Sequence, residues 1–494
     1  MPFPFSLPTT SHLSFQAHYS SSTHPSLPAT ATSYRSVLRA ALKKHKRLPS
    51  ASQPGNLPTI VSAINDYLPY LLALDAGLSG RQTSGEDIDI VLKSEVIVEW
   101  RPMIASSQVP TRDAARIKGL GLDFEIAFAI QTFATVQVLL AREQLLTLYA
   151  EDLPSPERRL AAVQNATKHL IIAESLHTYI VQRYNGTSDA LNIPAAAVDI
   201  NEAVQAALSS LSLAETTILF VLKDDPYPAL TIQSRSKTDK EWMIKAPDIP
   251  KVRAHLFARL SLAASDHAGK AAAGLSSTGT KVSSDLVRYA EDLRRVARAK
   301  ACRFFGLDAD LSGNTGEGIA WLRAGMNELG ITGSVASGGP SFSKLKSTIQ
   351  SHRASPHLLK PGSSNPSWGL DAGKLEESLT ISMLEKKWVK INDTMNVQLI
   401  PESAPLAASM PSGRDIYKAN AWKPVPLAAE ELAKMRAPIH NDDGLQRRLG
   451  ELGIGDSSDE EGADEMTRQT GPVGAFPGTH THYSRNNRGD EAYF

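Results

Sequence analysis

The sequence predicts a mainly α-helical protein, an array of long antiparallel helices with one small β-hairpin and an unstructured tail. Three observations lead to this fold class. Long stretches rich in Ala, Leu and Ile recur from residue 114 onward, and such stretches with short links form bundles or α-solenoids. One short segment, 87–100, instead alternates apolar and polar residues. Beyond residue 425 the chain turns acidic and then rich in Gly, Asn and His, which is typical of segments that bury no core.

The N-terminal part is expected to hold an irregular arm and two helices. Residues 1–33 are rich in Ser, Thr and Pro, and their aromatic residues are expected to dock on the fold. Helices are predicted at 34–47 and 57–76, and Pro69 should kink or split the second.

The segment DIDIVLKSEVIVEW, residues 87–100, is the best strand candidate. Its alternation predicts two strands joined by a turn at Lys93–Ser94, which together form a hairpin.

Helices dominate from residue 114 to the end of the predicted core. The prolines of LPSPE stop one helix and start the next. No fixed-period repeat is present, which disfavours a strict consensus TPR array, and the Gly, Ser and Pro-rich stretch 330–367 is expected to be a long loop. The predicted helices are 122–150, 155–184, 200–223, 249–271, 281–304, 315–329 and 371–391.

The helix containing SLSLAETTILFVLKD, residues 210–224, poses a packing problem. A helical wheel places Leu213 and Phe220 nearly opposite the expected core face, beside Thr216 and Thr217. A large aromatic residue on the far side of a helix needs a second neighbouring helix or a partner protein. The expected core face consists of Leu211, Ala214, Ile218, Val221 and Leu222.

The composition argues against several classes of protein. The 494 residues include 52 Lys plus Arg and 52 Asp plus Glu, so wholesale phosphate neutralisation, and with it nucleic-acid binding, is not expected. The single cysteine, Cys302, forms no intrachain disulfide and no thiolate zinc site. No apolar run reaches the ~20 residues of a membrane span, and MPFPFSLPTT lacks the features of a signal peptide. We therefore expect a cytoplasmic protein.

No active site can be assembled from the residues. Cys302 is either a reactive thiolate or a core cysteine, and the core interpretation is favoured. The chain has no GxSxG elbow and no P-loop. His169 and His177 lie two helical turns apart, too far to share a metal. We expect no cofactor, no metal and no catalysis; the alternative is an enzyme with an unrecognised site near Cys302 or in the loop 330–367.

Three short signals have a plain and a functional interpretation, and the plain one is favoured for each. YPAL at 227–230 is either a Pro-rich turn or a YPxL docking motif. Ser457 and Ser458 before DEE are either part of a solvated acidic tail or kinase sites. The run KKHKR is either a solvated helix end or a contact with anionic lipid, which would use Lys43, Lys44, Lys46 and Arg47.

Several stretches follow one another in the order in which a known family has them. They are EVIVEWRPMI with GLDFEIAFAIQTFATVQVLLARE, then PAAAVDINEAVQAALSSLSLAETTILFVLKD, IPKVRAHLFARLSLAASDHAGKA and WVKINDTMNVQLIPESAPL. In this series residues 1–425 resemble the Bro-one domain, the boomerang-shaped helical domain of Alix and its fungal relatives, which leaves 426–494 as a disordered tail. MPFPFSLPTT, LKKHKRLP and VLKDDPYP are most similar to the fungal pH-response branch of the family.

The chain departs from the family pattern at several points. Ile391-Asn392-Asp393 stands where the family has xEND, Lys223-Asp224 stands in place of KA, and His267 and Ala268 replace an aromatic pair. The V arms and the Pro-rich tail of Alix are not matched, so their partners are not carried over.

The resemblance implies a non-enzymatic adaptor built from TPR-like helix pairs. Bro-one domains bind the C-terminal amphipathic helix of the core ESCRT-III polymer subunit in a hydrophobic patch, and the patch residues match Phe220, Leu256 and Leu260. The spacing of the two leucines puts them on one helix face, as helix-in-groove binding requires; ordinary inter-helix core is the competing interpretation.

The resemblance also implies a place for the chain in the cell. It points to fungal ambient-pH signalling, with other components of that pathway as partners and recruitment to the plasma membrane or endosomes. The alternative within the family is an Alix-like endosomal sorting and multivesicular body factor.

Overall fold

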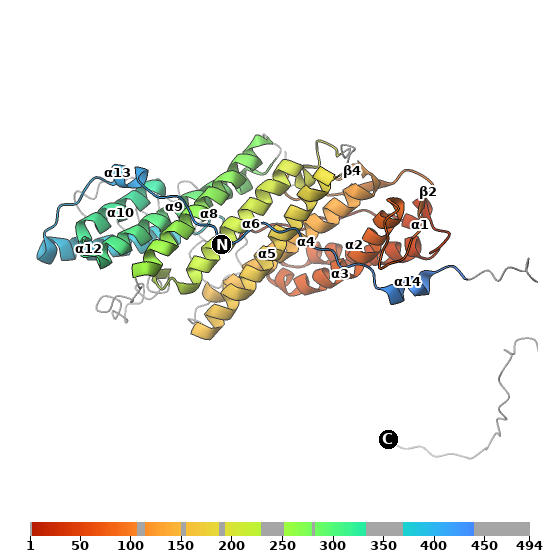
Figure 1. The fold of residues 1–494 in the computed structure, drawn as a ribbon, viewed down its shortest axis with the longest axis horizontal. Coiled ribbons are helices and arrows are strands. Elements are labelled where there is room, and N and C mark those ends of the chain that lie inside the picture. The colour runs from red at the N-terminus through yellow and green to blue at the C-terminus, as the bar shows by residue number, and fades with distance from the viewer. Residues whose placement is uncertain are drawn as a thin grey trace, which may run out of the picture. The chain divides into compact units, whose positions relative to one another are not determined.

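The computed structural model describes residues 2–105, 114–149, 155–186, 193–228, 251–278, 282–331 and 369–438. The chain divides into two units, Met1–Ala437 and Pro438–Phe494, and the first unit is described below. The predicted mainly α fold class is confirmed, and Figure 1 shows the helices of this unit lying side by side in chain order from α2 to α12.

The N-terminal elements bury the aromatic residues of the arm. α1 (Phe15–His18) and β1 (Tyr19–Ser20) precede α2 (Leu27–Arg47), and Phe15 and Tyr19 are both buried. α2 starts earlier than predicted because Pro28 is accepted in the first turn of a helix. After η1 (Ser50–Ser52), α3 (Gln53–Leu78) continues through Pro69 as one element, so it is not split.

The strands predicted in 87–100 exist, but the predicted pairing is wrong. β2 (Val91–Leu92) pairs antiparallel with β1, and β3 (Ile97–Trp100) pairs antiparallel with β4 (Ile117–Leu120). The two strands therefore do not form a hairpin with each other about Lys93–Ser94. Alternation specifies a strand and its buried face, whereas the partner is chosen by the tertiary fold.

The long helices correspond one by one to the predicted ones, and consecutive helices pack against each other. Short elements link them or follow them: η2 (Thr147–Tyr149), η3 (Val198–Ile200), η7 (Asn392–Asn396), α13 (Ser403–Ala408) and α14 (Ala429–Met435). The long helices are α4 (Gly121–Leu146), α5 (Pro156–Gly186), α6 (Glu202–Asp224), α8 (Lys251–Ser277), α9 (Ser284–Leu311), α10 (Thr315–Glu328) and α12 (Lys374–Ile391).

Within the part of the chain that the structure describes, two helices are long and apolar enough to cross a membrane, contrary to the expectation from the sequence. They are α4 and α6, and most of each is buried inside the fold. Core helices of globular domains have this character because neighbours surround them on all sides.

α6 is buried nearly all round, because it lies between α5 and α8. Leu213, expected on the far side, is 9% exposed, and Thr216 and Thr217 are buried. The two threonine hydroxyls donate to carbonyls one turn back in the same helix, so their burial leaves no polar group unpaired. The expected core face is therefore only part of the surface that α6 buries, and Leu213 packs as core on the opposite side.

An extended strap, residues 409–428, returns along the helices after α13. Arg414 N–H donates to the carbonyl of Arg259 on α8, and Trp422 N–H donates to that of Ser175 on α5. The Trp422 ring meets Tyr179 edge-on at 5.4 Å. At Gly413 a Cβ would lie 2.5 Å from the backbone nitrogen of Ala263, so only glycine allows this close approach.

The compact unit extends past the predicted boundary at residue 425. α14 follows the strap, and its Leu432 and Met435 are buried in the core of the N-terminal helices. The unit ends at Ala437, whose N–H donates to the carbonyl of Thr23. The remainder of the predicted tail, with Ser457 and Ser458, lies outside the described residues.

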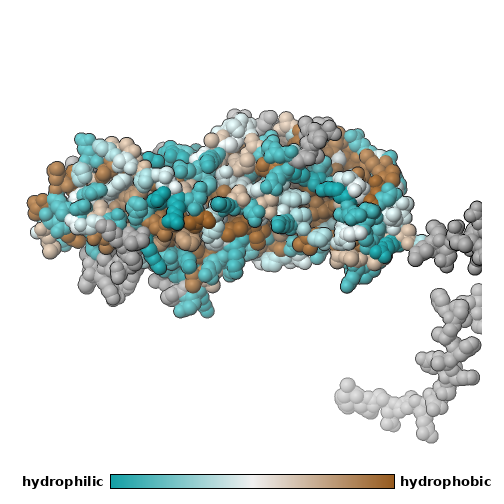
Figure 2. All heavy atoms as spheres, viewed as in Figure 1, coloured by the Kyte–Doolittle hydropathy of each residue, from teal (hydrophilic) through white to brown (hydrophobic). Residues whose placement is uncertain are grey.

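The most exposed large apolar side chains of the described residues lie in η7 and directly after it. Met395, Val397 and Leu399 are 78 to 90% exposed, and Figure 2 shows hydrophobic residues at the end of the unit where α12 lies. Polar neighbours hold this segment in place, since the Asn392 side chain exchanges two hydrogen bonds of 3.0 Å with the backbone of Gln398.

Candidate functional site

The candidate site lies where α6 ends and α8 begins. The Asn201 side chain caps α6 by accepting from the N–H groups of Ala203 and Val204. The helix stops at Asp224 because the next residue precedes Pro226, and a residue before proline disfavours the helical conformation. Phe220 thus lies one turn from a fixed helix end.

A buried cluster of charges holds the chain immediately after α6. Asp225 accepts from Arg303 Nη2 at 2.5 Å, and Glu377 of α12 accepts from Arg303 Nε and Lys300 Nζ at 2.6 Å each. None of these four side chains is more than 8% exposed. Burial alone would raise the pKa of both carboxyls, but the charges of Arg303 and Lys300 outweigh it and hold both pKa values below their usual range.

The same cluster encloses Tyr227, the first residue of the YPxL sequence. Tyr227 is 5% exposed, and the Arg303 guanidinium lies 5.4 Å from the centre of its ring. A docking motif must be displayed as a free segment, so this tyrosine is not available for one. Pro228 is also buried, and the last two positions of the sequence, 229 and 230, lie outside the described residues.

The three predicted partner-binding residues differ in their exposure. Phe220 and Leu256 are half-buried and pack against the same apolar core cluster, which contains Phe257 and Phe304. Leu260 belongs to that cluster and is fully buried. Phe220 and Leu256 therefore retain exposed surface for a partner, whereas Leu260 is part of the core against which they pack.

Charged residues lie beside this patch, at the end of α6 and the start of α8. Arg253 at the start of α8 lies 3.9 Å from Asp224 at the end of α6, and Lys223 is exposed. An apolar centre with a charged rim is the usual composition of a protein-binding surface.

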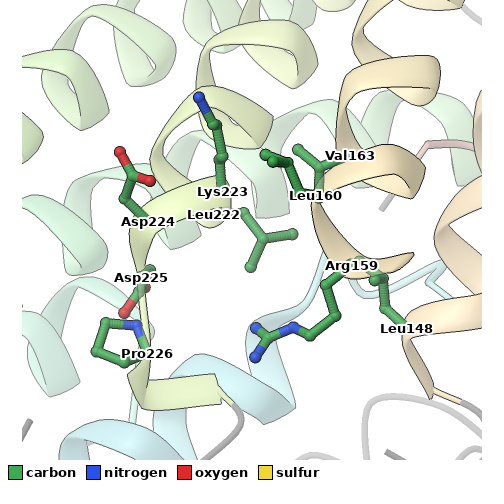
Figure 3. A pocket seen from close by; sticks show the side chains of 9 residues that line it. All are labelled: Leu148, Arg159, Leu160, Val163, Leu222, Lys223, Asp224, Asp225 and Pro226. Atoms are coloured by element: carbon green, nitrogen blue, oxygen red, sulfur yellow. The ribbon is translucent and has the colours of Figure 1, made fainter. Parts of the chain in front are cut away.

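A cavity of about 200 Å³ opens on the other side of the α6 terminus, toward α5 (Figure 3). This cavity was not predicted from the sequence, because it depends on how α5 docks beside α6. Its one sign in the sequence is an apolar residue near the start of α5, Leu160. In the structure the side chain of Leu160 is 40% exposed. The lining residues are Leu148, Arg159, Leu160, Val163, Leu222, Lys223, Asp224, Asp225 and Pro226.

Cys302 is a core cysteine. Its side chain is fully buried, and burial raises the pKa of the thiol to about 12, which removes the thiolate needed for nucleophilic attack. The loop proposed as the other enzymatic location falls mainly on residues 332–368, outside the described residues.

The two histidines of α5 take part in separate hydrogen bonds. Nδ1 of His169 lies 2.6 Å from Oε1 of Gln137, and Nδ1 of His177 lies 2.8 Å from Oε1 of Gln205. Burial lowers the pKa of His177 to about 4, so the ring is neutral. In the described ranges no group of three or more His, Cys, Asp or Glu side chains is placed to hold a metal.

The basic run forms the end of α2. Lys44, Lys46 and Arg47 are exposed, and Lys43 is half-buried. Desolvation lowers the pKa of Lys43, as do the neighbouring charges of Arg39, Arg116 and Arg47. Lipid binding by this run stays a prediction.

Comparison with known proteins gives one curated relative and several similar structures. The pH-response regulator protein palC of Emericella nidulans is 44% identical over 532 residues, covering 100% of both chains. No protein-family model matches. ALIX in complex with the SIVmac239 PYKEVTEDL late domain superposes with a TM-score of 0.55 at 14% identity, over 91% of this chain and 53% of that one. An ALIX BRO1–CHMP4C complex gives a TM-score of 0.48 at 16% identity, over 86% and 95% of the two chains.

The likeness to ALIX concerns the fold alone, and it shows that the chain shares the helical architecture of that protein. The chain spans about half the length of that ALIX chain.

Proposed function

Because the chain belongs to the family of the pH-response regulator palC, we propose that it is a non-enzymatic adaptor in ambient-pH signalling that binds the C-terminal helix of the core ESCRT-III polymer subunit. The observation that carries this proposal is the patch of Phe220 and Leu256, half-exposed beside a helix end that buried charges hold in place. Such a pair is suited to anchor one amphipathic helix.

The position of Phe220 supports a role beyond packing. The side chain lies on the α8 side of α6 and contacts the core cluster with only part of its surface. A half-buried aromatic at a rigid position loses little side-chain entropy on binding, which is why aromatic residues dominate the energy of many interfaces.

The fold supports an adaptor that works by bringing proteins together. The ALIX structure with which this chain shares its architecture holds a bound late-domain peptide. We place the protein in the cytoplasm, recruited to endosomes or the plasma membrane through the polymer subunit, with other components of the pH-signalling pathway as further partners.

A binding assay with matched variants tests the proposal. Phe220→Asp and Leu256→Asp should each weaken binding of the subunit's C-terminal helix at least tenfold, which is about 1.4 kcal/mol, because a carboxylate would be buried against apolar surface. Ile171→Asp, on α5 and 39% exposed, is the control and should bind like the wild type. Circular dichroism must show that each variant is folded.

Normal binding by folded Phe220→Asp and Leu256→Asp would refute the patch. Leu260→Asp is unsuitable for this purpose, because a charge at a fully buried position is expected to unfold the domain.

A further inference from the structure

We propose that the cavity between α5 and α6 is a second subsite for the same partner helix, and that it accepts an apolar side chain flanked by a carboxylate. This inference rests on the proposed function and extends it. It specifies which residues the partner must carry beside those that meet Phe220.

The last turn of α6 presents apolar side chains on both of its sides. Phe220 packs toward α8, whereas Leu222 packs against the core shared by α4 and α5. Residues two apart on a helix differ by 200° in direction, so one partner that crosses the end of α6 would meet both.

The size and lining of the cavity suit one side chain. Its walls include Leu148, Leu160, Val163 and Leu222, and Figure 3 shows Leu160, Val163 and Leu222 around the open space between the two helices. About 200 Å³ is below the 300–1,000 Å³ typical of small-molecule pockets. A cavity this small, open between two helices, fits an aliphatic side chain of a docking protein.

The charges at the cavity favour an acidic partner. Figure 3 shows Arg159 extending from α5 into the open space. The two acidic lining residues are already engaged, Asp225 by Arg303 at 2.5 Å and Asp224 by Arg253 at 3.9 Å. Among the described residues no ion pair is formed by Arg159. A carboxylate on the partner would supply its counter-charge, with two parallel hydrogen bonds available to the guanidinium.

The helix spacing fixes the distance between the two anchors. Neighbouring helices pack 8–10 Å apart, and the two subsites lie on opposite sides of α6. A partner helix rising 1.5 Å per residue covers this distance in about five to seven residues. We therefore expect two apolar anchors about two turns apart on one face, with Asp or Glu three or four residues from the second.

Fluorescence anisotropy with a labelled peptide of the subunit's C-terminal helix and the full chain tests the inference. Arg159→Glu and Leu160→Asp should each weaken binding about tenfold. Arg158→Glu makes the same charge reversal at the neighbouring position, which does not line the cavity. The affinity of this variant for the peptide should stay within about twofold of the wild-type value. Ile171→Asp is the control for Leu160→Asp.

A charge swap locates the contact. Each acidic residue of the peptide is changed to Lys in turn, and one such peptide should regain most of the lost affinity for Arg159→Glu while losing affinity for the wild type. If Arg158→Glu weakens binding as much as Arg159→Glu, the effect is general electrostatics and the subsite is refuted. Wild-type affinity in folded Arg159→Glu and Leu160→Asp refutes it as well.

The two proposals fail in different ways. Loss of binding in Phe220→Asp with normal binding in the cavity variants leaves the adaptor proposal standing and removes the second subsite. Normal binding in Phe220→Asp removes the adaptor proposal itself.

Discussion

Two buried charge clusters join distant parts of the chain, and they do so differently. In the first, which we call the Glu125 cluster, one carboxylate of α4 accepts from Arg35 Nε at 2.8 Å, from the Tyr67 hydroxyl at 2.8 Å and from Trp100 Nε1 at 2.7 Å. Arg35 also donates to Thr10 in the arm. This cluster has one anion, one cation and neutral donors.

The second, which we call the Asp225 cluster, has two carboxylates and two cations. Asp225 and Glu377 share Arg303 and Lys300, so it connects the segment after α6 with α9 and α12. Both clusters are neutral as wholes, but only the second adjoins the candidate binding surface.

The difference separates stability from binding. The Glu125 cluster joins the arm, α2, α3, β3 and α4, all remote in sequence from the patch. The Asp225 cluster fixes the residue that follows the last turn of α6, where Phe220 and the cavity lie. We infer that the first cluster stabilises the fold alone, and that the second also sets the position of the partner-binding residues.

Arg303→Met should have the largest effect. It leaves Asp225 and Glu377 buried with Lys300 as their only cation, and uncompensated buried charge typically costs about 3–5 kcal/mol. Urea unfolding should therefore show a loss of this size in the free energy of unfolding. Binding of the partner peptide to the folded variant should also weaken.

The pH dependence of this variant is the sharper measurement. In the wild type both carboxyl pKa values are lowered, so their contribution to stability is lost only as the pH falls through those low values, and it is constant between pH 7.5 and 5. Without Arg303 the buried carboxyls should have raised pKa values. As the pH falls they should become protonated, which removes the uncompensated charge and restores part of the lost stability.

The loss in free energy of unfolding of Arg303→Met relative to the wild type, which we call its deficit, should therefore shrink by about 1 kcal/mol or more as the pH falls from 7.5 to 5. In the double variant Arg303→Met with Glu377→Gln, one anion faces one cation, so both the deficit and its pH dependence should be smaller. A deficit that grows toward pH 5 would contradict the pairing.

Glu125→Gln should have an intermediate effect. The amide keeps the shape of the side chain but points an N–H₂ group at a site lined by donors, so a loss of about 2–3 kcal/mol is expected. Because Arg35 retains Thr10 and the carbonyl of Ser11 as acceptors, the loss should be smaller than for Arg303→Met. Peptide affinity of the folded variant should equal that of the wild type, and a weakened affinity would refute the separation of the two roles.

The helices could be predicted because the composition of each segment and the residues that end it are local features of the sequence. α4 and α6 are rich in apolar residues along most of their length, and breaks such as LPSPE mark where helices stop. The pairing of β1 with β2 and the course of the strap could not be predicted, since both depend on contacts between residues far apart in the chain. Glu125, the second of two acidic residues in the otherwise apolar stretch GLDFEIAFAI, is the local sign of this buried cluster.

The site was predictable in part. The helical wheel placed Phe220 outside the expected core face, and in the structure its side chain is only partly buried. Leu256 and Leu260 looked equivalent by spacing, yet Leu260 is fully buried, because a one-turn offset along α8 changes which neighbours cover a side chain. Arg159 had no signal in the sequence, since its role depends on the gap between α5 and α6.

Arg295→Met should have the smallest effect and calibrates the comparison. Arg295 lies on α9, as Arg303 does, but its side chain is 40% exposed and pairs with Glu291 at 3.0 Å on the helix surface. Glu291 keeps a second partner, Arg294, at 2.7 Å. Exposed pairs contribute at most about 1 kcal/mol and are screened by salt, so the loss in urea unfolding should stay below that value and vanish in 1 M salt. A loss equal to that of Arg303→Met would show that removing any arginine from α9 destabilises the domain, and that burial of the Asp225 cluster is not the cause.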